Sequence, residues 1–283
     1  MRQKLYNISD KIDGLTLEIL KKIKLKAVEL EIDFFLVGAT VRDIILNYVY
    51  NITVYRKTND IDFAIRIRNW DEYYRLTTEI QKIGFEKNER IMQRYKYNGM
   101  IIDFIPFGEI SLNKKTIVWP DGSEKEMNII GFDDAFQNTE DLIIQSDPEI
   151  KVKVASVIAL VVLKIFAWND RSIDLRIKDA KDLYLIISTY IDAGNQERLY
   201  DHLDIVEQAE DYELSGAILL GRDIKNSISA KLLEAIIEIL SNENLQSLAN
   251  DMSRYENLHR ETEDEKVKWC VELLTALKLE MQK

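Results

Sequence analysis

Asp60 and Asp62 lie two residues apart in the segment Thr58–Phe63. On a β-strand, residues i and i+2 point to the same side, about 6–7 Å apart along the backbone. Two like charges held this close repel each other, so they are retained at low cost when a cation lies between them. Hard divalent ions such as Mg²⁺ take oxygen ligands of this kind, often together with substrate phosphates. The pair is a candidate metal site, and a solvated strand edge is the alternative for an isolated Asp-X-Asp.

A third acid, Asp103, stands within the otherwise apolar segment 100–106. A carboxylate in such a strand is costly unless it is paired or metal-bound. Taken alone, Asp103 is better explained by a structural salt bridge. Beside Asp60 and Asp62, it would complete a site for two divalent ions about 3.5–4 Å apart.

The segment Gly38–Asp43 joins a short apolar run to a helical pattern. Small residues, Gly38 and Ala39, let a ligand approach the backbone, and free N–H groups at a helix start suit a phosphate. Thr40 can donate a hydroxyl, and Arg42 can bridge to a phosphate or to a nearby carboxylate. The alternative is an ordinary turn with a helix cap.

A second group of polar residues lies further along the chain. Lys164, Trp168 and Arg171 fall at i, i+4 and i+7, which places them on one helical face. A lysine in an apolar helix needs an anion, and a triphosphate is one such anion. The alternative is a lysine that extends to solvent beside a core tryptophan.

The elements that must position these residues follow from hydrophobic periodicity. Asn98-Gly99 between two apolar segments predicts a tight hairpin. The pattern predicts helices over 15–30, 41–49 and 70–83, and strands over 34–37, 60–68, 94–97 and 100–105. Alternating β and α segments with one antiparallel hairpin imply a mixed sheet covered by helices, an α+β fold.

After Pro148 the strand signal disappears, because the spacing of apolar residues becomes three to four. This pattern predicts helices over 152–168, 178–190, 229–240 and 265–281. All three prolines and seven of the ten glycines lie before residue 150. We therefore expect a turn-rich domain over residues 1–150 and a helical bundle over residues 151–283.

Composition excludes several classes of protein. One cysteine, Cys270, rules out a disulfide framework and a cysteine-based zinc site. A formal net charge of −11 argues against indiscriminate nucleic-acid binding by a basic surface. The longest apolar stretch, 154–163, is about half of the ~20 residues that a membrane span needs, and residues 1–14 carry no secretory signal. We expect a cytoplasmic protein without a membrane segment.

Together these segments resemble the nucleotidyltransferase superfamily that includes DNA polymerase β and the tRNA CCA-adding enzymes. The pattern is more similar to one branch, the AbiEii-type nucleotidyltransferases, which are toxins of bacterial abortive-infection and toxin–antitoxin systems. The resemblance covers residues ~30–190, and we expect a polymerase β-like mixed sheet from it. The segments that carry it are Val37–Asp43, Arg56–Phe63, Ile102–Gly108, Gly131–Phe132, Leu163–Lys164, Ala167–Arg171 and Lys178–Leu183.

The resemblance implies roles for the residues of the first part. Asp60 and Asp62 would bind two Mg²⁺ ions, for which Mn²⁺ can substitute. Asp103 would bind the catalytic ion and help to deprotonate the incoming hydroxyl. Gly38 and Thr40 match the Gly-Ser pair that holds the triphosphate, although Ala39 and Thr40 replace the usual second Gly or Ser.

In the second part, the resemblance makes Lys164 and Arg171 nucleotide-binding residues. Lys178, Asp179 and Asp182 would match the C-terminal motif of the family, in which one of the two acids orients the nucleotide or a neighbouring lysine. The sequence leaves open which acid does so. A helix-surface pair between Lys178 and Asp182 is the alternative.

The implied activity is transfer of a nucleoside monophosphate from a nucleoside triphosphate to an acceptor hydroxyl, with release of pyrophosphate. For a toxin, the acceptor would be a tRNA or other RNA 3′ end or another cellular molecule, and an antitoxin protein would restrain it. One alternative is the same chemistry on a small molecule, as in aminoglycoside nucleotidyltransferases. The other is a non-catalytic module that senses nucleotides or binds a partner; the three acids and Lys164 weaken this alternative.

Overall fold

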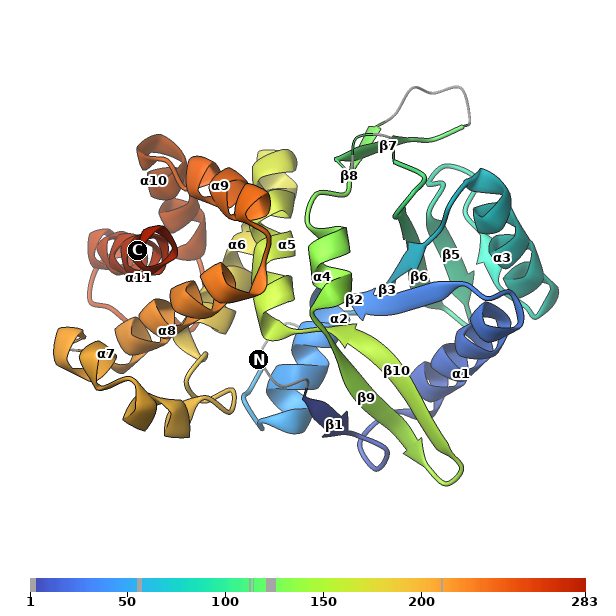
Figure 1. The fold of residues 1–283 in the computed structure, drawn as a ribbon, viewed down its shortest axis with the longest axis horizontal. Coiled ribbons are helices and arrows are strands. Elements are labelled where there is room, and N and C mark those ends of the chain that lie inside the picture. Colours follow the sequence, from blue (N-terminus) through green and yellow to red (C-terminus); the bar gives the residue numbers. More distant parts are fainter. Residues whose placement is uncertain (1–3, 55–57, 112, 114, 121–125, 210) are drawn as a thin grey trace. The chain divides into compact units, whose positions relative to one another are not determined.

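The computed structural model describes residues 4–54, 58–111, 113, 115–120, 126–209 and 211–283 (Figure 1). The chain divides into two compact units, Met1–Ser156 and Val157–Lys283. The first combines a mixed sheet with helices, and the described part of the second is helical (Figure 1). The predicted fold class is confirmed.

The first unit is built on one large mixed sheet with the strand order β1-β9-β10-β2-β3-β6-β5-β4. Its strands are β1 (Leu5–Asn7), β2 (Asp33–Val37), β3 (Asp60–Arg66), β4 (Glu86–Lys87), β5 (Arg94–Tyr97), β6 (Met100–Phe107), β9 (Thr139–Ser146) and β10 (Glu149–Ala155). A separate ribbon pairs β7 (Thr116–Val118) with β8 (Glu126–Asn128). In the centre of the large sheet, β3 runs parallel to β6 and antiparallel to β2.

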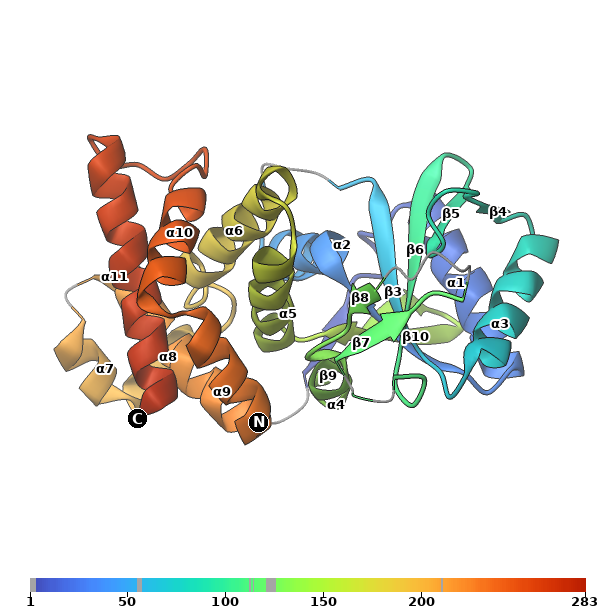
Figure 2. The same cartoon turned by 90° about the horizontal axis from the view of Figure 1, so that it is seen from above.

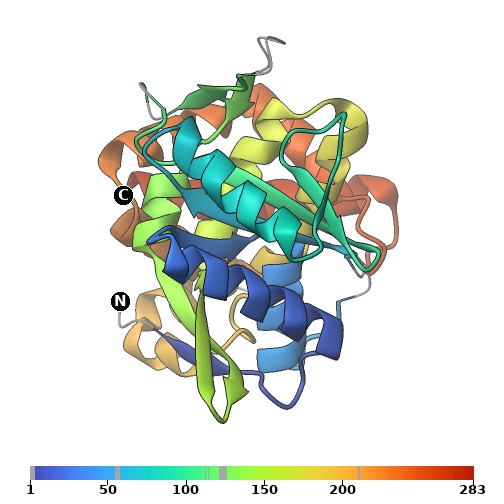
Figure 3. The same ribbon diagram turned by 90° about the vertical axis from the view of Figure 1, so that its right-hand side faces the viewer.

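Strand β3 shows the predicted alternation. Ile61 and Phe63 are buried on one face, and the ring of Phe63 packs 5.4 Å from that of Phe104 between ring centroids. Helices α1 (Gly14–Glu29) and α3 (Trp70–Lys82) lie side by side over this face (Figure 3). The apolar face of β3 thus belongs to the core, and its acidic residues point to the other side of the sheet.

The opposite face of the sheet is covered in part by a short helix, α4 (Phe132–Gln137). The ring of Phe136 lies 5.8 Å from both Phe35 and Phe107. After β2 the chain enters α2 (Gly38–Asp43) and continues as a π-helix, η1 (Ile44–Val49). The helix predicted over 41–49 therefore exists, but it begins directly at the end of β2.

The Asn98-Gly99 hairpin is confirmed. Both residues have positive φ, 47° and 86°, as a two-residue turn of this type requires. The turn pairs Tyr97 with Met100, and the register then places Arg94 directly opposite Asp103.

The helix predicted over 152–168 is wrong at its start, because residues 149–155 form strand β10 and helix α5 begins at Val157. Val152 and Val154 are buried, whereas Lys151 and Lys153, which alternate with them, are more exposed, and this is the period of a strand. Strand β10 pairs with β9 along its length and with Leu36 of β2.

The second unit contains helices that the periodicity predicts and others that it does not. The described elements are α5 (Val157–Asp170), α6 (Ile173–Ser188), the 3₁₀-helix η2 (Gln196–Asp201), α7 (Leu203–Gln208), α8 (Tyr212–Ser227), α9 (Ala230–Ile239), α10 (Asn242–Met252) and α11 (Glu263–Gln282). Helix α11 starts with a capping box between Thr262 and Glu265 and packs against α8 and α10 (Figure 2). Within the described residues, every helix is too short or too polar to cross a bilayer.

Candidate active site

Three carboxylates share one face of two neighbouring parallel strands. Asp60 and Asp62 lie on β3, and Asp103 lies on β6 directly beside Asp62 in the strand register. Because side chains at paired positions of neighbouring strands point to the same side, the sheet gathers all three acids on the face opposite α1 and α3. Asp103 is only 7% exposed.

Two threonines fix Asp60. The Thr58 hydroxyl donates to the Asp60 carboxylate, and the Thr40 hydroxyl donates to the backbone carbonyl of Asp60. Thr40 was expected to donate to a phosphate, but in this structure its hydroxyl links the first turn of α2 to strand β3. Arg56, part of the same sequence motif, lies outside the described residues.

Gly38 packs directly against Asp62. It has a φ of +78°, a region that L-residues with a side chain rarely adopt, and a Cβ built on it would overlap the Asp62 carboxylate. Gly38, Ala39 and Thr40 form the first turn of α2. The start of α2 and the acidic face of β3 are therefore in contact.

We expect Gly38→Ala to destabilise the protein by about 1–2 kcal/mol, because alanine at positive φ brings Cβ too close to the backbone. Its Cβ would also push the flexible Asp62 carboxylate aside, so nucleotidyl transfer should fall about tenfold or more. Urea denaturation and a transfer assay measure the two effects separately.

Gly14→Ala is the matched control, because nothing lies within 4 Å of a Cβ at this position. Gly14 begins α1, where alanine is tolerated. Equal stability and activity of both glycine variants would contradict the assigned role of Gly38.

Asp103 carries a resident partner, Arg94. The Nε of Arg94 donates to Oδ1 of Asp103 at 2.9 Å, and Nη2 donates to Oδ2 at 2.7 Å. These hydrogen bonds raise the pKa of Arg94, and the charges of Asp103, Asp60 and Asp62 raise it further against the opposing effect of burial. Arg94 thus lies in the field of all three acids, and the structural salt bridge that the sequence left open for Asp103 is present.

The donor set fits a divalent metal chemically, since it consists of carboxylate oxygens that already attract a cation. In the described part of the chain, no three acidic, histidine or cysteine side chains converge as a metal-ligand group in this conformation. Both oxygens of Asp103 accept hydrogen bonds from Arg94 instead.

Arg42 is an interior residue. Its side chain is 1% exposed and forms an ion pair with Asp43. Of the two partners that the sequence suggested for Arg42, phosphate or a nearby carboxylate, the structure shows a carboxylate. A buried charge of this kind is stable only when paired, and Asp43, the next residue of α2, supplies the opposite charge.

In the second unit, Lys164 of α5 is buried among acids of α6. Its Nζ lies 2.5 Å from Asp182 and 3.6 Å from Asp179. The nearby Arg171 also contacts Asp179, at 2.6 Å. The anions that Lys164 needs are therefore carboxylates in this structure, and both acids contact this lysine. Lys178 is exposed on α6.

Trp168 is a core residue, as in the alternative that placed a core tryptophan beside Lys164. It is 2% exposed, and its indole N–H donates to Asp251 at 3.0 Å. The guanidinium of Arg176 lies 4.9 Å from its ring centroid and 2.8 Å from Asp251. Neither partner was predicted from the sequence, and Asp251 in particular is far away in the chain.

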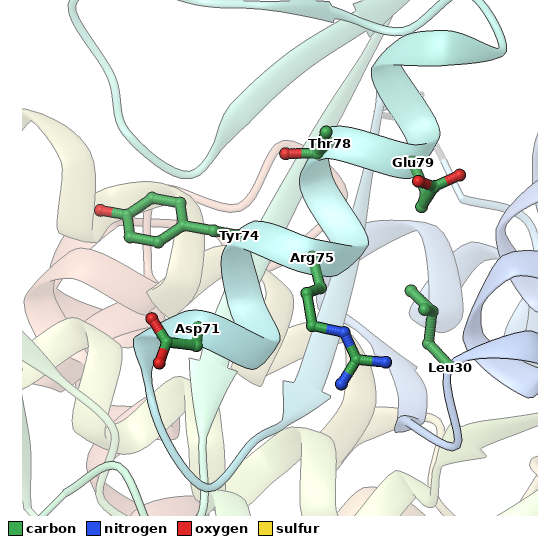
Figure 4. Close-up of a pocket in the computed structure, with 6 residues that line it drawn as sticks. All are labelled: Leu30, Asp71, Tyr74, Arg75, Thr78 and Glu79. Carbon is green, nitrogen blue, oxygen red and sulfur yellow. The ribbon is translucent and has the colours of Figure 1, made fainter.

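A cavity of about 370 Å³ opens on the other side of the first unit. Figure 4 shows that most of its wall comes from α3 and that Leu30 contributes from the end of α1. Arg75 of α3 lies among acidic and apolar side chains. Since α3 covers the face of the sheet opposite the carboxylates, this cavity is separate from the candidate active site. Its lining residues are Leu30, Asp71, Tyr74, Arg75, Thr78 and Glu79.

Comparison with known proteins identifies a family. The sequence model described as "Nucleotidyl transferase AbiEii toxin, Type IV TA system" matches residues 19–272. No curated protein matches the chain in sequence.

Several solved structures are similar in fold to this chain. The antibiotic-resistance factor ANT(2″)-Ia has 15% identity and a TM-score of 0.39, with 70% of this chain and 99% of that chain covered. A nucleotidyltransferase-like protein from Paracoccidioides brasiliensis has 16% identity and a TM-score of 0.40, with coverages of 69% and 93%. A CCA-adding enzyme in complex with ATP has 12% identity and a TM-score of 0.28, with coverages of 92% and 68%.

Proposed function

The chain belongs to the AbiEii nucleotidyltransferase toxin family, and we propose that it is a metal-dependent toxin that transfers a nucleoside monophosphate from a nucleoside triphosphate to an acceptor hydroxyl. The observation that carries the metal-dependent part is the grouping of Asp60, Asp62 and Asp103 on one face of β3 and β6. Repelling charges that share a face and draw in a cation are typical of a metal-binding active site.

In this mechanism, Asp60 and Asp62 would hold Mg²⁺ or Mn²⁺, and Asp103 would join them. Such ions, when bound, activate the acceptor hydroxyl and stabilise the charge of the leaving pyrophosphate. The side chains of the protein would position the carboxylates and assist proton removal. Thr58 orients the Asp60 carboxylate, and Gly38 leaves space for the Asp62 carboxylate. Asp103 would help to deprotonate the incoming hydroxyl.

For the triphosphate, we propose the first turn of α2, formed by Gly38, Ala39 and Thr40. Its proximity to the Asp62 carboxylate and to strand β3 supports this assignment. From the helical part of the chain, we assign Arg171 and Lys178 to the nucleotide, since both carry exposed cationic side chains.

Four further residues would act by positioning neighbouring side chains. They are Arg42, Lys164, Asp179 and Asp182. Lys164 would hold α5 and α6 together through Asp179 and Asp182, so that Arg171 keeps its place. Arg42 would act through Asp43, with which it forms an ion pair inside α2. We propose that the first unit, Met1–Ser156, is the catalytic domain; its boundary lies after residue 150, because strand β10 belongs to its sheet, and the helical domain is Val157–Lys283.

We propose an RNA 3′ hydroxyl, such as that of tRNA, as the acceptor. A nucleotide added there would block aminoacylation, which accounts for toxicity by a single transfer reaction. The family description as a toxin of a toxin–antitoxin system supports the existence of a cognate antitoxin. We also propose that the reaction takes place in the cytoplasm.

The acceptor is identified by incubating the protein with each α-labelled triphosphate, Mg²⁺ and total cell extract. We expect label in an RNA band that ribonuclease removes. Label that appears only in small molecules would support the small-molecule alternative, and label in protein would replace RNA as the acceptor.

Toxicity has its own test in regulated expression. We expect the wild-type chain to arrest growth and Asp60→Asn to be harmless, because loss of one ligand charge removes the metal site. Equal amounts of both proteins must be present. Equally harmless wild type and variant would remove support for the toxin assignment.

A further inference from the structure

We propose that Arg94 is the built-in counter-ion of the carboxylate site, and that a divalent metal must displace it from Asp103 before the third acid can act as a ligand. This inference rests on the proposed function, since it concerns the same site. Arg94 would thereby weaken metal binding and keep the metal-free protein stable.

The geometry supports a direct competition. Both Asp103 oxygens accept hydrogen bonds from one guanidinium, at 2.9 and 2.7 Å. Two parallel hydrogen bonds of this kind are strong and directional. A metal ion needs at least one of these oxygens, so it cannot use Asp103 while the pair is intact.

The strand register makes this arrangement part of the fold. Asp62, Asp103 and Arg94 occupy consecutive positions across β3, β6 and β5. The Asn98-Gly99 turn fixes the pairing of β5 with β6. Arg94 can therefore leave the site only by changing its side-chain torsions, and its partly exposed side chain (29%) has room to do so.

The charge of Arg94 also opposes the entry of a divalent ion into the site. Arg94 lies in the field of Asp60 and Asp62 as well as Asp103. An arginine cannot clear the site by losing its proton, because guanidinium stays charged in proteins. An incoming divalent ion therefore meets a permanent positive charge that repels it, and only movement of the side chain relieves the repulsion.

The metal-free protein depends on the same contact. Asp103 is 7% exposed, and without Arg94 its charge would be buried beside Asp60 and Asp62 without the two hydrogen bonds that it now accepts. Removal of one member of such a pair is strongly destabilising. A bound metal would supply the missing charge, so the loss of Arg94 should matter most when metal is absent.

The test uses the full-length chain and Mn²⁺ as the probe. Isothermal titration gives the Mn²⁺ dissociation constant, and thermal unfolding is followed in EDTA and in saturating Mn²⁺. We expect Arg94→Gln to bind Mn²⁺ about tenfold more tightly than wild type. Its Tm should fall in EDTA and recover in Mn²⁺, and Arg94→Lys, which keeps the charge but not the paired hydrogen bonds, should lie between the two.

Arg90→Gln is the matched control. It changes an exposed arginine in the loop before β5, and we expect wild-type Mn²⁺ affinity and wild-type Tm values. If wild type binds Mn²⁺ and Arg94→Gln shows the same affinity and the same metal-induced shift in Tm, the inference is overturned and the proposed function stands. If neither protein binds Mn²⁺, both are overturned.

Discussion

Asp62→Asn is expected to reduce nucleotidyl transfer by about 10³-fold or more, because it removes one charged oxygen ligand from the centre of the carboxylate face. Metal ions contribute several kcal/mol of transition-state stabilisation, and each 1.36 kcal/mol is tenfold in rate. Asn is nearly isosteric with Asp, and it relieves repulsion with Asp60 and Asp103. The free energy of unfolding should therefore change by less than about 1 kcal/mol.

Asp33→Asn provides the comparison for this variant. Asp33 is an exposed carboxylate on β2, the strand next to β3, and it is paired with Arg66 in the register, away from the three acids. We expect wild-type transfer rates and wild-type stability. Full activity of Asp62→Asn would refute the metal-dependent mechanism, and equal losses in both variants would show that the loss is not specific to the site.

Lys164→Met is expected to lower the free energy of unfolding by about 3–5 kcal/mol. Methionine fills a similar volume but leaves Asp179 and Asp182 buried without their shared cation. Breaking a buried ion pair from one side costs the desolvation of the remaining charge, which packing does not recover. Urea denaturation followed by circular dichroism measures the change.

Two variants separate this effect from a general loss of helix stability. Lys178→Met changes an exposed lysine on α6 and should alter stability by less than about 0.5 kcal/mol. Lys164→Met combined with Asp182→Asn should recover part of the loss, because one buried charge is also removed. A Lys164→Met protein as stable as wild type would show that the cluster of Lys164, Asp179 and Asp182 is not an energetic link between α5 and α6.

The face that carries the three carboxylates was largely predictable from the sequence, because strand geometry is local. Alternation along residues 60–68 separates Asp60 and Asp62 from the apolar side, and the structure has this arrangement. The position of Arg94 opposite Asp103 was also predictable from the sequence. A two-residue turn at Asn98-Gly99 fixes the register of the hairpin, and counting back from it places Arg94 opposite Asp103.

Contacts between distant segments could not be predicted in this way. The anions around Lys164 come from another helix, and their identity depends on how α5 and α6 rotate against each other. Asp251, which pairs with Arg176 and Trp168, is more than seventy residues away from both in the sequence. Single-helix periodicity shows which face is buried but not which residue it meets.

Strand β10 was missed for a different reason. Its buried residues Val152 and Val154 are followed directly by the apolar helix α5, and a continuous apolar run fits a buried strand and a buried helix equally well. The decisive contact is long-range, since Val154 pairs with Leu36 in β2. Pairing of this kind is invisible to a window that slides along the chain.

Metal-dependent transfer of the nucleotide itself is tested most directly with one triphosphate labelled at either of two positions. Wild-type protein is incubated with cell RNA and the triphosphate carrying label at the α- or the γ-phosphate, in Mg²⁺ or in EDTA. We expect α-label in the RNA and γ-label in released pyrophosphate, with neither product in EDTA. Transfer of γ-label to the acceptor, or α-label transfer that persists in EDTA, would contradict metal-dependent nucleotidyl transfer.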